Sequence, residues 1–257
     1  MQKEIARRLM KTKWVQDRLQ EDWVRETFED WTIDSFRRGL KPEGKPRYDD
    51  FVNSLQKGEK TALSSYIDMF LGFDFKSGIK GLEKLTDLKD KPILIVSNHV
   101  NNGPMRGGWQ HAVASYYLKQ TTGKEIRLTH GSDPTTTQDL FRDRLQNSIN
   151  SIPVRDTDPS RSLMLLRQAI RQGDSIVIYP EGDGSRNLRR GLPEAGRLIG
   201  ICARSGMGII SCSARYQSDT FFLTFDTLDM TEIERLTSKG TNRINRYSQR
   251  VSENPEL

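Results

Sequence analysis

The sequence predicts an α/β protein with a largely parallel central sheet flanked by helices, preceded by an N-terminal helical extension. From residue 81 onward, short apolar runs of strand length alternate with segments of helical periodicity. This alternation is typical of a parallel sheet that is covered on both faces. Residues 1–80 have helical periodicity without comparable strand-like runs. We therefore divide the chain of 257 residues into a helical region at 1–80, an α/β domain at 81–230 and a C-terminal helix and tail at 231–257.

The N-terminal region is predicted to contain helices joined by a turn. Residues 41–46 hold two prolines and a glycine, which indicates a linker. A further helix is expected over about 50–73. The first forty residues place apolar side chains at roughly helical spacing, at Ile5, Leu9, Val15, Leu19, Trp23, Phe28 and Trp31.

The α/β domain is predicted to alternate strands and helices along its length. One helix begins at Asp158-Pro159, an N-cap followed by proline at the first helical position, and ends at Gly173. Two other helices are expected at 108–119 and 193–205. The expected strands are 93–96, 125–128, 175–179, 209–213 and 221–225.

Composition and cysteine usage favour a cytoplasmic protein. No stretch approaches the roughly 20 apolar residues that span a bilayer, and the N-terminus has no signal-peptide core. Cys202 and Cys212 both lie in apolar segments, which suits buried free thiols in a reducing compartment. Three widely spaced histidines and two apolar cysteines do not form a metal cluster, so we expect neither a metal nor a bound cofactor.

The formal net charge of +6 predicts an anionic partner: nucleic acid, an acidic membrane surface or a phosphorylated substrate. Zinc-ligand spacing, an RNP-type aromatic strand and a helix-turn-helix are all missing from the sequence, so we expect no nucleic acid. Trp14, Trp23 and Trp31 lie near basic residues and allow a peripheral contact with the inner membrane surface. The acidic residues between them favour packing on the α/β domain, and both interpretations stay open.

Two segments place polar residues at the ends of predicted strands. The strand at 93–96 leads through Ser97 into Asn98-His99, where the carboxyl end of a parallel strand forms a ligand site. A histidine there can act as a general base for a hydroxyl, or it can simply bond the backbone of its own turn. The strand at 175–179 leads into the glycine-rich segment 180–186, which can cradle a phosphate or form an ordinary solvated loop.

Three segments, in this order, resemble the motifs of the glycerolipid acyltransferases, the superfamily of lysophosphatidic acid and glycerol-3-phosphate acyltransferases. They are Asn98-His99, Ile152-Pro153-Val154-Arg155 and Tyr179-Pro180-Glu181-Gly182. The resemblance covers residues 81–229 and leaves the N-terminal eighty residues outside. It implies transfer of a fatty acyl group from an acyl-CoA or acyl carrier protein thioester to a hydroxyl of a lysophospholipid or glycerol phosphate, within phospholipid biosynthesis.

The resemblance also implies roles for individual residues. His99 is the expected catalytic base, which deprotonates the acceptor hydroxyl. The substrate-binding pocket is expected to comprise Asn98, Arg155, Glu181, Gly182, Ser185 and Arg186.

The chain departs from the family at the catalytic pair. In the family a histidine and an aspartate are separated by four residues, whereas here Pro104 holds the aspartate position, so the motif is degenerate. Asp133, which follows the neighbouring strand, is the candidate replacement carboxylate, although Asp133-Pro134 also suits a simple turn. A catalytically impaired protein that binds anionic lipid, and an acyltransferase with a non-phosphorylated acceptor, remain the alternative hypotheses. Pro104 and Asp183 favour the first of these, and the second would also explain the altered Glu-Gly-Asp-Gly turn that contains Asp183.

Overall fold

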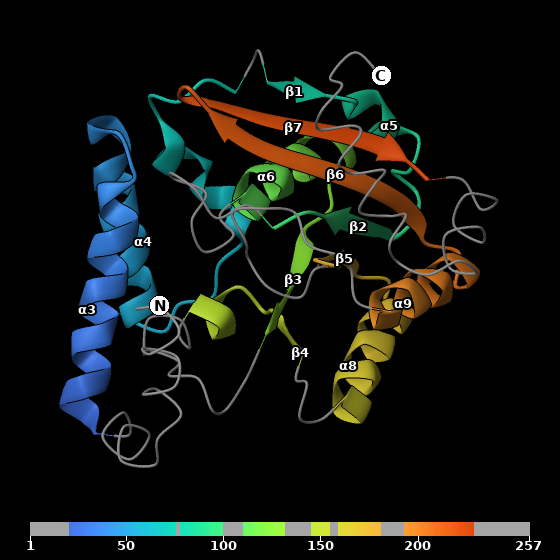
Figure 1. Cartoon of the computed structure of the whole chain (residues 1–257), viewed down its shortest axis with the longest axis horizontal. Helices are drawn as coiled ribbons and strands as arrows, with labels where there is room; N and C mark the ends of the chain where they lie inside the picture. Colours follow the sequence, from blue (N-terminus) through green and yellow to red (C-terminus); the bar gives the residue numbers. More distant parts are fainter. Residues whose placement is uncertain are drawn as a thin grey trace, which may run out of the picture.

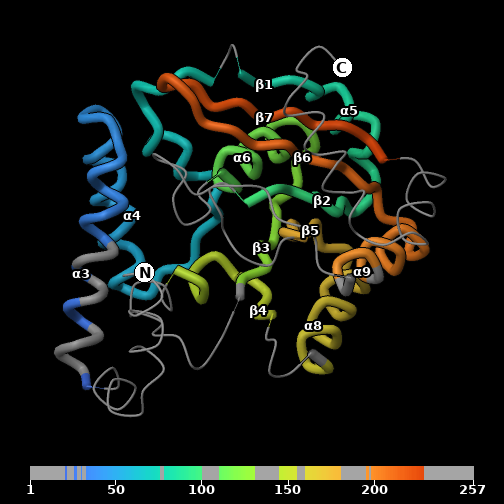
Figure 2. Tube along the Cα trace, viewed as in Figure 1, coloured from blue at the N-terminus to red at the C-terminus, as the bar shows by residue number. Residues whose placement is uncertain are grey.

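The computed structural model describes residues 21–75, 78–99, 110–131, 145–154, 159–180 and 193–228 (Figure 1). The apolar positions predicted before residue 21 and the C-terminal helix and tail predicted at 231–257 lie outside these ranges. Figure 2 traces the same path from α3 through the sheet to β7.

The described strands form one seven-stranded mixed sheet in the order β1-β7-β6-β2-β5-β3-β4. Each pair of neighbours from β6 to β4 is parallel, while β6 and β7 are antiparallel. The predicted α/β class with a largely parallel sheet is therefore confirmed. The strands are β1 Ile79–Lys80, β2 Ile93–Ser97, β3 Ile126–Gly131, β4 Ile152–Val154, β5 Ser175–Ile178, β6 Gly208–Gln217 and β7 Thr220–Thr227.

Helices cover both faces of the sheet, and each face has its own apolar cluster. On one face the cluster joins α4, η2 and α6 to the sheet through side chains such as Phe51, Phe70 and Leu118. On the other face α8 and α9 contribute Leu166 and Ile199. The helices are α3 Asp22–Arg38, α4 Lys45–Gln56, α5 Leu82–Thr86, α6 Gln110–Thr122, α8 Pro159–Arg171 and α9 Pro193–Arg204, with 3-10 helices η1 Pro42–Gly44 and η2 Leu63–Phe70.

The segment expected as one helix over about 50–73 forms two separate helices. α4 begins earlier, at Lys45, and ends at Gln56. Gly58 follows with φ +72°, a left-handed conformation that an α-helix cannot contain and that glycine tolerates best. The chain then resumes as η2, so the single-helix prediction was wrong because a glycine stop signal was overlooked.

Two strands of the sheet were not predicted. β4 contains Pro153, which cannot donate a ladder hydrogen bond, and it lies at the edge of the sheet, where proline is tolerated. β1 has only two residues, Ile79–Lys80, and offers no alternation to detect. The predicted strands at 209–213 and 221–225 are longer than expected and form a hairpin, whose turn residues Ser218 and Asp219 have φ values of 48° and 63°.

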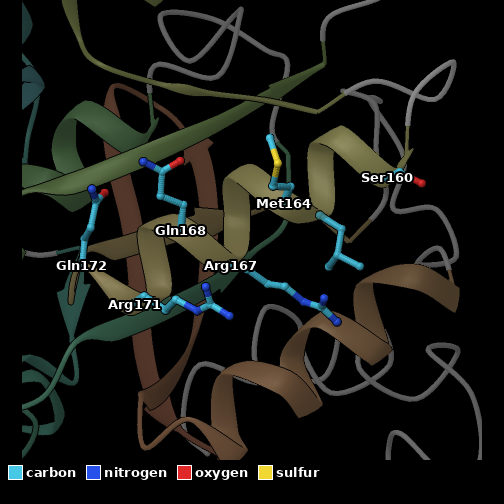
Figure 3. A pocket seen from close by; sticks show the side chains of 7 residues that line it. Ser160, Met164, Arg167, Gln168, Arg171 and Gln172 are labelled. Carbon is cyan, nitrogen blue, oxygen red and sulfur yellow. The ribbon is translucent and has the colours of Figure 1, made fainter.

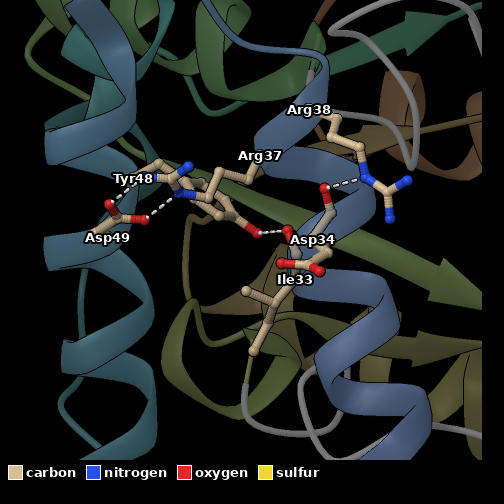
Figure 4. A network of polar contacts seen from close by, with 6 residues as sticks. All are labelled: Ile33, Asp34, Arg37, Arg38, Tyr48 and Asp49. Carbon is tan, nitrogen blue, oxygen red and sulfur yellow. Dashed lines mark hydrogen bonds and ion pairs between the residues drawn. The ribbon is translucent and has the colours of Figure 1, made fainter. Parts of the chain in front are cut away.

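The N-terminal helix α3 is joined to α4 by a polar network (Figure 4). The Arg37 guanidinium donates two hydrogen bonds to the Asp49 carboxylate, at 2.8 and 2.9 Å, and lowers the pKa of that carboxyl. The Tyr48 hydroxyl donates to the backbone carbonyl of Ile33 at 3.1 Å. α4 in turn packs on the sheet domain, so these contacts connect α3 to the domain through α4.

Gly81 allows the chain to turn sharply from β1 into α5. It adopts φ +77° as the residue before the helix. A Cβ atom at this position would lie 2.0 Å from the backbone oxygen of Phe225 on β7. Both the backbone conformation and the close approach to β7 therefore require glycine.

Candidate functional site

The starts of the two segments predicted at strand ends lie side by side, at the carboxyl ends of β2 and β5. β2 and β5 are parallel neighbours, with Val96 opposite Ile178. Asn98-His99 follows β2 directly, and Tyr179 follows β5. Ligands bind at this edge in open α/β sheets. The fold thus brings together the start of the first motif and the start of the third, about 80 residues apart in the sequence.

Asn98 fixes the turn that leaves β2. Its side-chain amide donates to the backbone oxygen of Ala214 at 2.9 Å, and its Oδ1 accepts from the Ala214 N–H at 2.7 Å. Its own carbonyl oxygen accepts from Nε2 of Gln110 at 2.9 Å. The Asn98 amide therefore faces the backbone of β6, and the substrate-binding role expected of it stays a prediction.

His99, Tyr179 and His111 form a compact group on the face of the sheet that α6 covers. The half-buried His99 ring lies 4.8 Å from the Tyr179 ring, centroid to centroid, with the planes tilted by 58°. The Tyr179 hydroxyl is 2.7 Å from Nδ1 of His111, which is buried in the first turn of α6. One tyrosine thus contacts the candidate base through its ring and a second histidine through its hydroxyl.

Burial keeps both His111 and Tyr179 neutral. Burial is the larger cause and the nearby His99 the smaller cause of a shift that lowers the pKa of His111 to about 3. Burial likewise raises the pKa of Tyr179 well above its ordinary value. The hydrogen bond between them can run in either direction, depending on the His111 tautomer; with the tyrosine as donor, Nδ1 of His111 accepts and Nε2 carries the histidine proton.

Cys212 lies beside this group but is chemically protected. It sits on β6 opposite Ser97. Burial raises the pKa of its thiol to about 12, although the hydrogen bond with Ser97 acts in the opposite direction. A thiol with such a pKa is not a nucleophile at neutral pH. Cys202 is buried within α9 in the apolar cluster on the other face, so the two free cysteines cannot pair with each other.

His130 occupies a related position on β3. β3 and β5 pair in parallel with Leu128 opposite Val177, and His130 and Tyr179 each come two residues further along. Because side chains alternate between faces, both belong to the face that α6 covers. All three histidines of the chain therefore lie on this face of the sheet.

The remaining residues expected at the site fall outside the described ranges. They are Pro104, Asp133, Arg155, Glu181, Gly182, Asp183, Ser185 and Arg186. The structure does describe the strands that precede them: β3 ends two residues before Asp133, β4 ends immediately before Arg155, and β5 ends three residues before Glu181. β5, β3 and β4 are parallel neighbours, and β5 is also parallel to β2. The carboxyl ends of all three strands therefore lie on the same side of the sheet as the carboxyl end of β2, which His99 follows.

A concave surface lies along α8, on the opposite face of the sheet from the His99 group (Figure 3). It encloses about 630 Å³. Its helix packs on the sheet through Leu166 and Ala169 of the other apolar cluster, so the groove is separate from the His99 group. It is lined by Ser160, Leu163, Met164, Arg167, Gln168, Arg171 and Gln172.

The described ranges contain neither a membrane-spanning helix nor a cluster of metal-binding side chains. None of the helices there is long and apolar enough to cross a membrane. In the same part of the chain, no group of three His, Cys, Asp or Glu side chains is placed to hold a metal ion.

Comparison of the chain with protein-family models and with curated proteins finds no match. The resemblance to the glycerolipid acyltransferases therefore rests on the order of the motifs in this sequence. The fold adds that the strands bearing the first and third motifs are neighbours.

Sequence analysis assigned no role to His111 or to Tyr179. The helix expected at 108–119, after the site, included His111, and the third motif included Tyr179, but no sequence pattern gave either residue a role. One signal was present in the sequence: Gln110 and His111 directly precede the apolar run Ala112-Val113-Ala114, which the structure buries. Polar side chains adjoining a fully buried helical segment require hydrogen-bond partners, which are found at the nearest strand ends.

Proposed function

We propose that the protein is an O-acyltransferase that moves a fatty acyl group from an acyl-CoA or acyl carrier protein thioester to a hydroxyl of a lysophospholipid or glycerol phosphate. The observation that carries this proposal is the position of His99. It is half-buried at the carboxyl end of a central strand, packed on Tyr179 of the neighbouring strand end. Both residues belong to segments that resemble motifs of one family.

The proposed reaction needs one proton acceptor. A neutral imidazole of His99 takes the proton from the acceptor hydroxyl as its oxygen attacks the thioester carbonyl. The carbon–sulfur bond then breaks, and the imidazolium returns the proton to the departing thiolate. The products are an oxygen ester and a free thiol. The substrate-binding residues beyond β4 and β5, chiefly Arg155 and Arg186, would bind the phosphate of the acceptor.

We further propose a cytoplasmic location with peripheral access to the inner membrane surface. Acyl chains and lysophospholipids partition into bilayers, so an enzyme acting on them needs contact with that surface. The net charge of +6 favours approach to anionic lipids. Vesicle sedimentation with neutral and anionic lipids tests this part, and equal weak binding to both would contradict it.

Pro104 favours a second candidate function. Proline cannot accept a hydrogen bond from an imidazole N–H through its side chain, as the aspartate of the family does. A protein of this fold that binds anionic lipid without turnover would tolerate that change. Asp183 favours a third, an acyltransferase whose acceptor lacks phosphate, because a carboxylate repels a phosphate group.

One experiment separates the three functions. Purified protein is given acyl-CoA or acyl carrier protein with lysophosphatidic acid, glycerol phosphate or a non-phosphorylated monoacylglycerol, and the ester products are identified by mass spectrometry. An Asp133→Asn variant is measured in parallel. Phosphorylated products support the first function, and their loss in Asp133→Asn identifies the replacement carboxylate. Lipid binding without any ester product supports the second, and ester formed only on the monoacylglycerol supports the third.

A further inference from the structure

Tyr179 lies between two histidines that come from different elements. Its ring is 4.8 Å from that of His99 beyond β2, and its hydroxyl is 2.7 Å from Nδ1 of His111 on α6. The His111 and Tyr179 rings are 6.1 Å apart, so the hydrogen bond, rather than stacking, is their main contact. The Tyr179 ring, which His99 packs against, is therefore held at its hydroxyl by a hydrogen bond to the buried His111.

We propose that His111 and Tyr179 form a positioning pair for His99, in which the hydrogen bond holds the tyrosine ring and the ring restricts the orientation of the His99 imidazole. The catalytic meaning of this inference rests on the proposed function, since His99 is a base only if the chain transfers acyl groups. Neither His111 nor Tyr179 is required to contact a substrate.

The surrounding hydrogen bonds make the pair rigid. Gln110, next to His111, donates to the carbonyl oxygen of Asn98 at 2.9 Å, and Asn98 is bonded to Ala214 on β6. The start of α6 is thus tied to the end of β2 through Gln110 and to the end of β5 through His111. A shift of Tyr179 relative to His99 would need one of these ties to break.

A positioning pair of this kind suits a chain in which Pro104 occupies the position of the family aspartate. A carboxylate orients an imidazole by accepting its N–H. A fixed aromatic ring orients it instead by limiting its rotation, without adding a charge. Orientation matters because misplacing a catalytic group by about 1 Å can lower a rate by a factor of about 100.

Within the described ranges, three ionisable neighbours of the His99–Tyr179 contact stay neutral near neutral pH. His111 from α6 has a pKa of about 3, and burial holds the pKa of Tyr179 from β5 well above its ordinary value. Cys212 from β6, with a pKa of about 12, also keeps its proton. His130 on β3 is the remaining imidazole near this edge. A change of the His99 NMR signals between about pH 5 and about pH 9 would therefore not come from ionisation of these three groups. A His130 variant identifies the signals that belong to His130.

The test is the imidazole 15N NMR spectrum of the full chain, which contains only three histidines. Each is assigned by a single substitution, and no substrate is needed. In the wild type we expect His111 as the Nε2–H tautomer and neutral His99 as one dominant tautomer. Tyr179→Phe keeps the ring but removes the hydroxyl, and His111→Leu removes the acceptor. In both, His99 should populate two tautomers, whereas His111→Asn, whose amide oxygen can replace Nδ1, should restore one.

Unchanged His99 signals in Tyr179→Phe, at an unchanged melting temperature, would overturn the positioning role. If His111→Leu does not fold, Tyr179→Phe decides alone, because it removes a single oxygen atom. In the acyl transfer assay, Tyr179→Phe should lower kcat by about 10-fold or more with little change in KM. Absence of turnover in the wild type would overturn the proposed function, while the NMR result would still decide whether the pair positions His99.

Discussion

The side-chain amide of Asn98 pairs with the backbone of Ala214 through both its oxygen and its nitrogen, at 2.7 and 2.9 Å. This pairing extends the contact between β2 and β6 beyond the last ladder pair, Ser97 with Cys212. It fixes where the chain leaves β2, and therefore where His99 is held. Asn98 therefore joins β2 to β6 and sets the position of the next residue, His99, at the candidate site.

Replacing Asn98 should destabilise the protein. In Asn98→Ala both polar groups of Ala214 lose their partner, which we expect to lower the free energy of unfolding by about 2 kcal/mol or more. Asn98→Asp should also destabilise, because a carboxylate cannot donate to the Ala214 carbonyl. Urea denaturation measures both. Asn53→Ala on the exposed side of α4 is the control and should stay within about 0.5 kcal/mol of the wild type. Equal stability of Asn98→Ala and the control would contradict a stabilising role for the Asn98–Ala214 hydrogen bonds.

Acid should destabilise the fold through His111. Its pKa is about 3 in the folded protein and 6.5 without burial, so the unfolded chain binds a proton that the folded protein excludes. The corresponding stability is fully present above pH 6.5 and is lost as the pH falls from 6.5 towards 3. Between pH 7 and pH 5 the loss from this group should be about 2 kcal/mol.

The matched variant for this effect is His111→Asn, which keeps an acceptor for Tyr179 but does not titrate. Urea unfolding at both pH values should show a smaller acid loss in the variant, by about 2 kcal/mol. Identical pH dependence in the two proteins would mean that His111 is accessible to protons in the folded state.

Both cysteines should resist modification in the folded protein. Burial raises the pKa of Cys202 and Cys212 alike to about 12, so little thiolate forms at pH 8. A colorimetric disulfide reagent should detect no fast-reacting thiol in native protein and two after unfolding in guanidinium. Ser205→Cys, at an exposed position after α9, provides the positive control. Rapid reaction of a native cysteine would show that one side of the sheet opens readily.

Among the described glycines with left-handed conformations, Gly81 should be the least replaceable. Gly81→Ala combines a φ of +77° with a Cβ placed 2.0 Å from the Phe225 oxygen. Gly58→Ala has a similar φ, +72°, but its Cβ would meet nothing within 4 Å. Gly58→Ala should therefore cost only the conformational strain, about 1–2 kcal/mol, and Gly81→Ala distinctly more. Thermal unfolding of the two variants compares them, and equal costs would contradict the close approach of β1 and β7.

The elements that could be predicted from the sequence are those with a strong local signal. β2 and β5 are continuous apolar runs, which suits strands buried on both faces. α8 ends where Gly173 adopts φ +76°, as its position predicted. β4 was missed because Pro153 is tolerated only at an edge, and a position at the edge is a property of the assembled sheet.

The candidate site was predictable only in part, for a similar reason. His99 could be inferred because a strand leads directly to it. His111 contacts Tyr179 across 68 positions of sequence, and no local pattern encodes that pairing. It arises because α6 covers the same face on which the β5 end projects Tyr179. The order of the motifs suggested a site, whereas its supporting contacts depend on how the helix packs.

The most direct measurement of the central claim is the initial rate of thiol release from acyl-CoA in the presence of lysophosphatidic acid, for wild type, His99→Ala and His130→Ala. His130 is a matched control, because it is also half-buried near the end of a parallel strand but is not placed as the base. We predict acceptor-dependent release in the wild type and in His130→Ala, with a loss of about 100-fold or more in His99→Ala. Release that persists at the wild-type rate in His99→Ala would contradict the assignment of His99 as the base.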